Sequence, residues 1–186
     1  MGPRVGIGVP GVLAAVIAYA IAAAPLSVSV CAASPHDAQI KADILHGLAL
    51  AVTWPDSALE PGPFVIGLVG HDESDPELAS LAGRTLRKRS LSLVPQLTAG
   101  AAREAQIVFI SRSEQARLTD LLGSLARRPL LTVSEIDGFC EAGGMVQLRR
   151  DRNRYRLLVN RAAAERAGLR LDPQLLKVAE IVEGGD

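Results

Sequence analysis

Short apolar segments alternate with helical patterns along most of the chain, and this alternation constrains the fold more than any other feature. Apolar runs occupy residues 64–69, 91–94, 107–110 and 130–133. Runs of this length without polar alternation are typical of strands that are covered on both faces. Because parallel neighbours need crossovers of about a dozen residues, the intervening helical patterns predict an α/β fold with a mainly parallel sheet flanked by helices.

The helical patterns precede and separate these runs. Apolar residues recur every four positions within residues 37–52, which predicts a helix there. An Asp-Pro pair predicts the start of a short helix over residues 75–81, and Pro129 closes a longer predicted helix over residues 111–128. The expected inner stripe of the longer helix consists of Leu118, Leu121, Leu122 and Leu125.

The C-terminal part of the chain departs from this alternation. Residues 145–148 and 155–159 flank a polar, turn-forming link, which predicts an antiparallel β-hairpin. Two helices then close the domain, one capped by Asn160 and one that starts at Asp172 and carries apolar residues as far as Ile181. The whole pattern predicts a single α/β domain.

Residues 1–32 have the pattern of an export signal. Arg4 is the only charged side chain among them, and an apolar segment occupies residues 12–21 before small residues that suit a signal peptidase. We therefore expect cleavage after Ala32. The remaining residues, 33–186, are expected to form one domain in the periplasm.

Other interpretations of the N-terminal segment are weaker. An uncut segment could serve as a membrane anchor, but Pro10 and Pro25 interrupt the apolar stretch. A lipid anchor on Cys31 would require a small residue directly before the cysteine, but Val30 at that position is branched. The Gly-x-Gly-x-x-Gly pattern in residues 6–11 lacks the preceding strand of a dinucleotide site, so we expect no cofactor.

Composition narrows the classes of function further. The 186 residues carry 20 basic and 20 acidic side chains, so no overall charge favours binding to nucleic acid. After cleavage only Cys140 would remain, either buried and inert or available to another chain, and we expect burial. The three histidines, His36, His46 and His71, lack the two-histidine spacing of a metal site, so no metal is expected.

One segment gathers residues that can bind a ligand or transfer protons. His71, Asp72 and Asp75 follow the run at residues 64–69, and α/β folds often form ligand sites where strands end. His71 and Asp72 are therefore our candidate ligand pocket. Asp75 has a structural role available as a helix cap, and no hydrolase elbow, phosphate loop or paired-carboxylate signature accompanies it, which disfavours an enzyme.

Basic residues cluster in residues 84–89 and again in residues 149–156. Solvated strand and turn surface is the default explanation for such residues in a hairpin. The functional alternative is an arginine-rich face that binds an acidic protein partner or a small anion.

The order of several short motifs resembles the YfiR family of small periplasmic proteins. These motifs are Trp54-Pro55, Val69-Gly70, Ile107 to Ser111, Leu130 to Val133, Gly143-Gly144-Met145, Val159-Asn160, Ala162-Ala163, Ala167-Gly168-Leu169 and Leu175-Leu176. The resemblance implies a non-enzymatic α/β domain, typically dimeric, that holds a membrane-bound diguanylate cyclase inactive by binding its periplasmic part. Release would raise cyclic di-GMP and favour biofilm formation, and the membrane would be reached only through the partner.

The chain departs from the family pattern in two respects. Gly67, Ala105 and Gln147 stand where the family has partner cysteines, so a redox switch through internal disulfides is not expected. Within residues 157–160, Leu158 replaces the acidic residue of the family's Phe-Glu-Ile-Asn segment. Carried over by position, the family's partner-binding surface consists of Val146, Leu158 and Ala164.

Three functions therefore compete. We favour the periplasmic repressor of a diguanylate cyclase. The alternative is a periplasmic module that senses a small ligand and feeds another envelope sensor, such as a histidine kinase. The third is an enzyme that uses His71, Asp72 and Asp75.

Overall fold

The computed structural model describes residues 35–59, 61–71, 78–98, 100–152 and 154–184. The chain divides into two units, Met1–Cys31 and Ala32–Asp186, and every described residue belongs to the second. The expected export signal, Asp72 and Asp75 lie outside the described residues. None of the described helices is long and apolar enough to cross a membrane.

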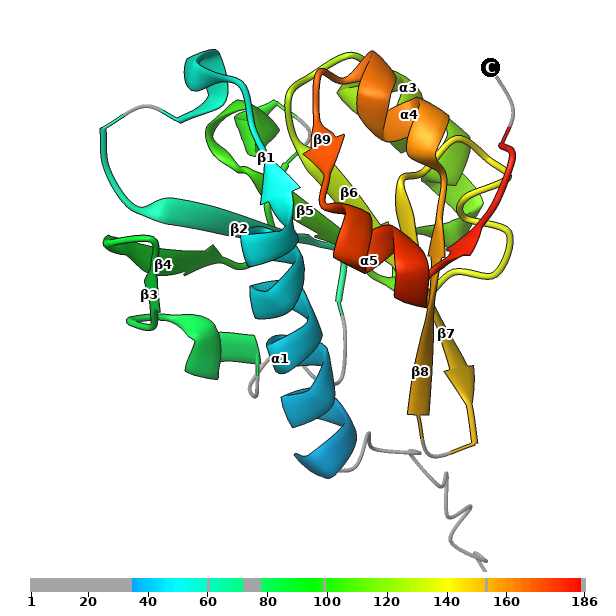
Figure 1. Cartoon of the computed structure of the whole chain (residues 1–186), viewed down its shortest axis with the longest axis horizontal. Coiled ribbons are helices and arrows are strands. Elements are labelled where there is room, and N and C mark those ends of the chain that lie inside the picture. The colour runs from blue at the N-terminus through cyan, green and yellow to red at the C-terminus, as the bar shows by residue number, and fades with distance from the viewer. Residues whose placement is uncertain (1–34, 60, 72–77, 99, 153, 185–186) are drawn as a thin grey trace, which may run out of the picture. The chain divides into compact units, whose positions relative to one another are not determined.

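Among the described residues, eight strands form one sheet (Figure 1). They are β2 (Phe64–Val69), β3 (Thr85–Leu86), β4 (Arg89–Val94), β5 (Ile107–Ile110), β6 (Leu131–Ser134), β7 (Val146–Asp151), β8 (Arg154–Val159) and β10 (Glu180–Ile181). Their order is β10-β8-β7-β6-β5-β2-β4-β3. The pairs β3 with β4 and β7 with β8 are antiparallel, and the other pairs are parallel. The prediction of an α/β domain with a mainly parallel sheet is confirmed.

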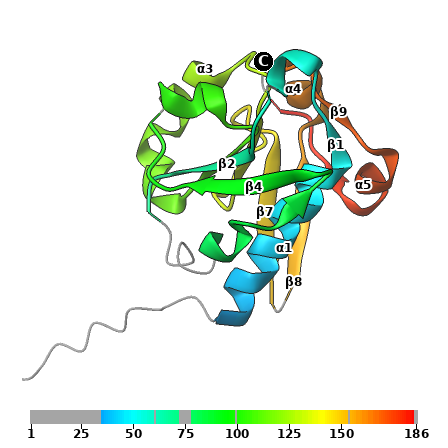
Figure 2. The same ribbon diagram turned by 90° about the vertical axis from the view of Figure 1, so that its left-hand side faces the viewer.

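Helices cover both faces of this sheet because its central strands are apolar on both sides. In β5, Ile107 and Phe109 belong to the buried cluster that includes α1 (Pro35–Ala51). Val108 and Ile110 belong to the cluster that includes α3 (Leu118–Leu125), on the other side of the sheet (Figure 2). The alternation of strand side chains between two buried clusters thus explains the continuous apolar run.

The predicted helix over residues 37–52 is confirmed as α1, but the helix predicted over residues 111–128 differs at both ends. It begins as the 3-10 segment η4 (Arg112–Arg117), in which no residue is buried, so no apolar stripe holds this part against the core. Three leucines of the predicted inner stripe are buried and Leu121 is half-buried. The α-helix ends at Leu125, because Ala126 has a ψ of 143° that no helix can continue, and Arg127 then adopts a φ of 59°.

The C-terminal elements follow the prediction apart from the end of the last helix. β7 and β8 form the predicted antiparallel hairpin. Asn160 caps α4 (Arg161–Arg166) and Asp172 caps α5 (Pro173–Val178), each through a side-chain oxygen that accepts a backbone N–H. The predicted continuation of this helix to Ile181 is wrong, since the chain becomes extended after α5 and joins the sheet as β10.

Short elements without a clear sequence signal complete the domain. β1 (Val52–Thr53) pairs antiparallel with β9 (Arg170–Leu171). Arg87 and Lys88 both adopt positive φ in the tight turn between β3 and β4. The remaining 3-10 segments are η1 (Asp56–Ala58), η2 (Ala79–Leu81) and η3 (Ala101–Glu104). η2 coincides with the end of the helix predicted over residues 75–81, most of which lies outside the described residues.

Candidate functional site

The carboxyl ends of the parallel strands β2, β5 and β6 lie next to one another at one end of the sheet. β2 leads into Gly70 and His71, β5 into Ser111, and β6 into Glu135. Ligand sites of open α/β sheets form outside this edge, because the connections that follow the strands converge there. The structure therefore brings polar residues from three separate parts of the sequence to one place.

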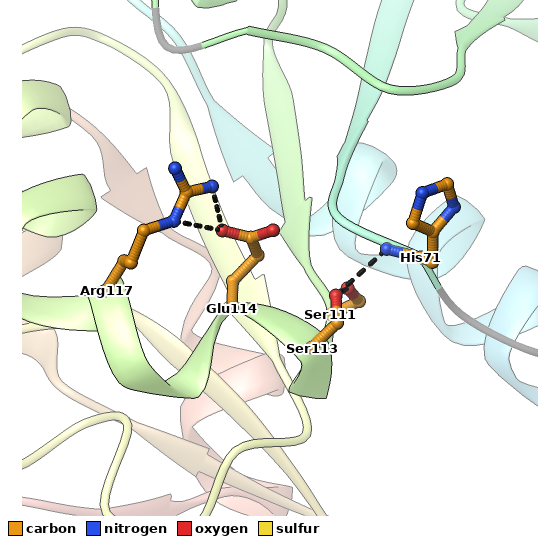
Figure 3. A network of polar contacts seen from close by, with 5 residues as sticks. All are labelled: His71, Ser111, Ser113, Glu114 and Arg117. Atoms are coloured by element: carbon orange, nitrogen blue, oxygen red, sulfur yellow. Dashed lines mark hydrogen bonds and ion pairs between the residues drawn. The ribbon is translucent and has the colours of Figure 1, made fainter.

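A polar network joins the end of β2 to η4 (Figure 3). Ser111 Oγ and Ser113 Oγ lie 2.7 Å apart, and the backbone N–H of His71 donates to Ser113 Oγ at 3.0 Å. Arg117 Nε donates to Glu114 Oε2 at 3.1 Å. These contacts fix the chain at the end of β2 against the first turn after β5.

Gly70 permits the close approach on which this network depends. Its φ is +84°, and a Cβ atom there would lie 2.3 Å from Ser111 Oγ and 2.4 Å from Ser113 Oγ. Both the backbone conformation and the lack of space exclude a larger residue. The backbone conformation and the close packing thus explain why the Val69-Gly70 motif has a glycine at residue 70.

The side chain of His71 takes no part in the described contacts of this network. The imidazole is exposed and points away from the serine pair, and only the backbone N–H is engaged (Figure 3). Ser111 is itself buried, at 2% exposure, so its hydroxyl is not open to a substrate. In the described part of the chain, no group of three His, Cys, Asp or Glu residues could hold a metal ion.

A cavity of about 340 Å³ lies beside the network. Its lining residues are Val69, Gly70, His71, Gln96, Leu97, Thr98, Glu114, Arg117 and Leu121. Glu114 and Arg117 offer a carboxylate and a guanidinium on the same wall, which suits a small polar or zwitterionic ligand. The candidate pocket at His71 is therefore built largely from η4 and the segment after β4, which the sequence patterns did not identify.

A buried ion pair lies where β6 ends. Lys41 Nζ lies 2.9 Å from Glu135 Oε2, and the two side chains are 5% and 9% exposed. The same ammonium lies 5.9 Å from the centroid of the Phe109 ring. Helical periodicity gave no signal for this pair, because the acidic partner is far away in the sequence. The pair connects α1 to the end of β6, and each charge compensates the other in a site with little water.

Cys140 is buried, as expected, and its thiol is held in the neutral form. Its Sγ lies 3.4 Å from the carbonyl oxygen of Leu158, and burial raises the pKa of the thiol to about 12. Nearby, Gln147 accepts a hydrogen bond from the N–H of Phe139 at 3.1 Å. A polar side chain thus braces this turn at a position where the YfiR resemblance implies a cysteine.

Gly67 and Ala105, the other two positions at which the YfiR resemblance implies cysteines, lie among apolar side chains. A Cβ atom on Gly67 would lie 2.2 Å from a methyl carbon of Leu97. Leu97 and Ala105 belong to the same buried cluster. The space beside Gly67 is therefore filled by a leucine side chain, and the core here is held by burial alone.

The three residues carried over as a partner-binding surface are buried in the described domain. Val146, Leu158 and Ala164 are 0%, 3% and 0% exposed. Val146 and Ala164 belong to the main buried cluster, and Leu158 pairs with Gln147 in the hairpin. An apolar patch at these positions would require exposure, which the folded domain does not provide. Their contact with a partner stays a prediction.

Comparisons with known proteins agree with this architecture. A family model described as YfiR/HmsC-like matches residues 38–180. A search of curated proteins finds no match. Among solved structures, a conserved domain protein from Vibrio cholerae O1 biovar El Tor strain N16961 is similar with a TM-score of 0.50 and 10% sequence identity, over 77% of this chain and 59% of that chain. At this identity the likeness shows a shared fold alone, and the chain covers less than two thirds of that protein.

Proposed function

Because this chain belongs to the YfiR/HmsC-like family over residues 38–180, we propose that it is a non-enzymatic periplasmic regulator that represses a membrane-bound diguanylate cyclase by protein–protein contact. Its release from the cyclase raises cyclic di-GMP and favours biofilm formation. The observation that carries the proposal is the extent of the family match, which runs from α1 to β10.

Repression of this kind needs differential binding and no chemistry by the regulator. A protein that binds only the inactive state of the cyclase stabilises that state by about 2.7 kcal/mol at a concentration one hundred times its Kd. A stimulus that weakens the contact reverses the effect.

The proposal includes export and self-association. Cleavage after Ala32 would leave residues 33–186 in the periplasm, where the membrane is reached only through the partner. The family resemblance adds a homodimer, which light scattering of the purified mature chain would measure directly.

Co-purification with a cyclase tests the proposed contact. The full chain, tagged at its C-terminus and expressed from its own signal, is isolated from detergent-solubilised envelopes with each membrane-bound diguanylate cyclase of the same cell expressed in turn. We expect one cyclase to be retained through its periplasmic domain and lost when that domain is deleted. Retention that depends on the cytoplasmic catalytic domain would contradict the proposal.

The cavity beside Gly70 and His71 favours a second function, a module that senses a small ligand. In this case the domain passes its bound state to another envelope sensor. Thermal unfolding of the mature chain with single amino acids and nucleotides distinguishes the two functions, because a ligand that binds only the folded state raises Tm. A rise in Tm together with the absence of any cyclase contact would favour this second function.

A further inference from the structure

A cavity of about 570 Å³ lies between α3, the first residues of β6, the turn before β7 and α4. α3 and α4 lie at the same end of the domain in both ribbon views (Figure 1, Figure 2). Among the described residues, this cavity shares no lining residue with the one beside Gly70. Its volume is in the range of sites that hold small organic molecules.

Small residues keep this cavity open. Gly123 of α3 and Gly143 in the turn before β7 line it, and nothing lies within 4 Å of a Cβ atom added to either glycine. Ala163 of α4 contributes only a methyl group to the wall. Because protein interiors are normally close-packed, space that small residues leave open beside buried side chains is available to a ligand.

The larger side chains of the wall are mainly apolar. Leu122 and Leu125 of α3 and Met145 before β7 all line the cavity and are buried in the domain. Such a wall favours a ligand with a hydrocarbon part, because contact with the wall removes that part from water. In the described part of the chain, the lining contains Arg127 and Arg166 but neither aspartate nor glutamate.

Two polar side chains in the wall have donor groups for which the described residues offer no acceptor. The guanidinium of Arg127 is exposed and makes no hydrogen bond or ion pair with a described residue. Thr132 is 2% exposed, and its Oγ1 accepts the N–H of Met145 at 3.1 Å. The Thr132 hydroxyl proton therefore meets no described acceptor, although buried hydroxyls usually have a partner. Arg166 already has an interaction partner, so the inference rests on Arg127 and Thr132.

We propose that this cavity binds a small organic carboxylate that carries a hydrocarbon chain. Its carboxylate accepts hydrogen bonds from the Arg127 guanidinium and the Thr132 hydroxyl, and its chain lies against Leu122, Leu125 and Met145. Hydrogen bonds between a guanidinium and a carboxylate are among the strongest in proteins, because both groups are charged. The apolar contact adds affinity in proportion to the hydrocarbon area that is buried.

Other classes of small molecule match only part of this wall. An inorganic anion could accept from Arg127 and Thr132 but would leave the leucine and methionine side chains in contact with water. A neutral hydrocarbon or alcohol would fill the apolar part but would leave the guanidinium without a charged partner. The combination of an apolar wall with two free donors therefore favours a carboxylate with a chain over either class.

Calorimetric titration of the full chain with octanoate tests the proposal. Octanamide has the same chain without the charge, and acetate has the charge without the chain, so these two probes separate the two contributions. Arg127→Gln removes the guanidinium, and Arg112→Gln is its control, because Arg112 is an exposed arginine of η4 that does not line the cavity. Thr132→Val removes the hydroxyl, whereas Thr132→Ser keeps it.

A cavity-filling variant tests the location without removing any polar group. Gly123→Leu places a larger side chain where the structure has room for it, and leucine favours a helix more than glycine does, so the fold should persist. Gly47→Leu is the matched control, because Gly47 is an exposed glycine of α1 with nothing within 4 Å of an added Cβ atom. Gly47 does not line this cavity.

We expect saturable binding of octanoate at a single site and no saturable binding of acetate. Octanamide, Arg127→Gln and Gly123→Leu should each weaken binding at least about tenfold, whereas Arg112→Gln and Gly47→Leu should change it less than about twofold. Thr132→Val should also weaken binding, and Thr132→Ser should restore it. No saturable binding of octanoate would overturn the proposal. Equal affinity for octanamide, for Arg127→Gln or for Gly123→Leu would overturn it as well.

Amide spectra of the ¹⁵N-labelled protein give an independent readout of the site. We expect octanoate to shift the signals of Gly123 and Gly143 and to leave those of Gly47 and Gly70 unchanged. A shift confined to Gly70 would assign the ligand to the other cavity, against the proposal. A cyclase takes part in none of these measurements, so their failure would leave the proposed function standing. An unchanged level of cyclic di-GMP after deletion of the gene would count against the proposed function alone.

Discussion

Replacing Gly70 with alanine tests whether the polar network at the end of β2 depends on close approach of the backbone. Gly70 has a φ of +84°, and the new methyl group would lie 2.3 Å from Ser111 Oγ and 2.7 Å from Glu114 Cγ. Gly83 is a matched control, because its φ is +83° and nothing lies within 4 Å of its added Cβ. Both substitutions therefore impose the same backbone strain, and only Gly70→Ala adds a collision.

The expected costs differ by an amount that unfolding experiments resolve. An alanine in the left-handed region costs about 1–2 kcal/mol, which sets the expected loss of unfolding free energy for Gly83→Ala. Gly70→Ala must also displace the serine hydroxyls and break at least one hydrogen bond, which adds about 1–3 kcal/mol. We therefore expect Gly70→Ala to be the less stable variant by about 2 kcal/mol.

Urea unfolding of the mature chain measures this difference. Trp54 is the only tryptophan and is 4% exposed, so its fluorescence reports loss of the core. For a domain of this size, a difference of about 2 kcal/mol corresponds to about 4–8 °C in Tm. Equal destabilisation by the two substitutions would refute the argument that the network depends on space at Gly70.

Three further predictions concern buried groups. Lys41→Met leaves the Glu135 carboxylate buried without this ion pair and should lower the free energy of unfolding by about 3–5 kcal/mol in the same urea assay. The double variant K41M/E135L should recover most of this loss, and equal losses for the single and double variants would contradict the role of the buried pair. Because the folded-state pKa of Cys140 is raised from 9.0 to about 12, the unfolded chain releases this proton first, so stability should fall between pH 9.0 and about 12, and Cys140→Ala should flatten that slope. Below pH 9.0 the thiol should stay inert to a disulfide reagent until denaturant is added, and rapid labelling of the native chain would count against its burial. Asn160→Ala removes both the cap of α4 and the hydrogen bond to the Cys140 carbonyl, with an expected loss of about 2–3 kcal/mol in the same urea assay. Asn160→Asp should lose at least as much, although its oxygen still accepts the N–H of Ala163, because a carboxylate oxygen would replace the amide donor 3.0 Å from the Cys140 carbonyl in a fully buried position.

The sheet could be predicted from the sequence because its signals are local. The apolar run of β5 coincides with its strand, since both faces of β5 are covered and no polar residue is tolerated. The cap residues Asn160 and Asp172 are likewise local signals, as each bonds a backbone N–H two or three positions later. Such patterns fix an element without knowledge of its neighbours.

Elements that depend on distant contacts carried no such signal. β10 has two residues, which are too few for an alternating pattern to distinguish a strand from the end of the preceding helix. Only the neighbouring β8, brought close by the fold, makes it a strand. The same holds for Lys41, whose burial depends on Glu135 at the end of β6.

The sequence indicates where a pocket could form, but it does not indicate most of the residues that line it. The position of Gly70 and His71 after β2 predicts a pocket at this end of the sheet, where the structure has a cavity, whereas Glu114 and Arg117 of its wall lie in a segment whose sequence pattern predicts only a helix. Residues carried over by position from the YfiR family come without information on their exposure, so the burial of Leu158 is seen only in the folded hairpin.

Cyclic di-GMP in a strain that lacks this protein tests the central claim most directly. The deletion strain is complemented with the full chain, or with residues 33–186 from which the export signal is absent. The account predicts that deletion raises cyclic di-GMP, that the full chain restores the low level, and that the form without the signal fails to do so at equal abundance. An unchanged level after deletion, or full restoration by the form that stays in the cytoplasm, would contradict it.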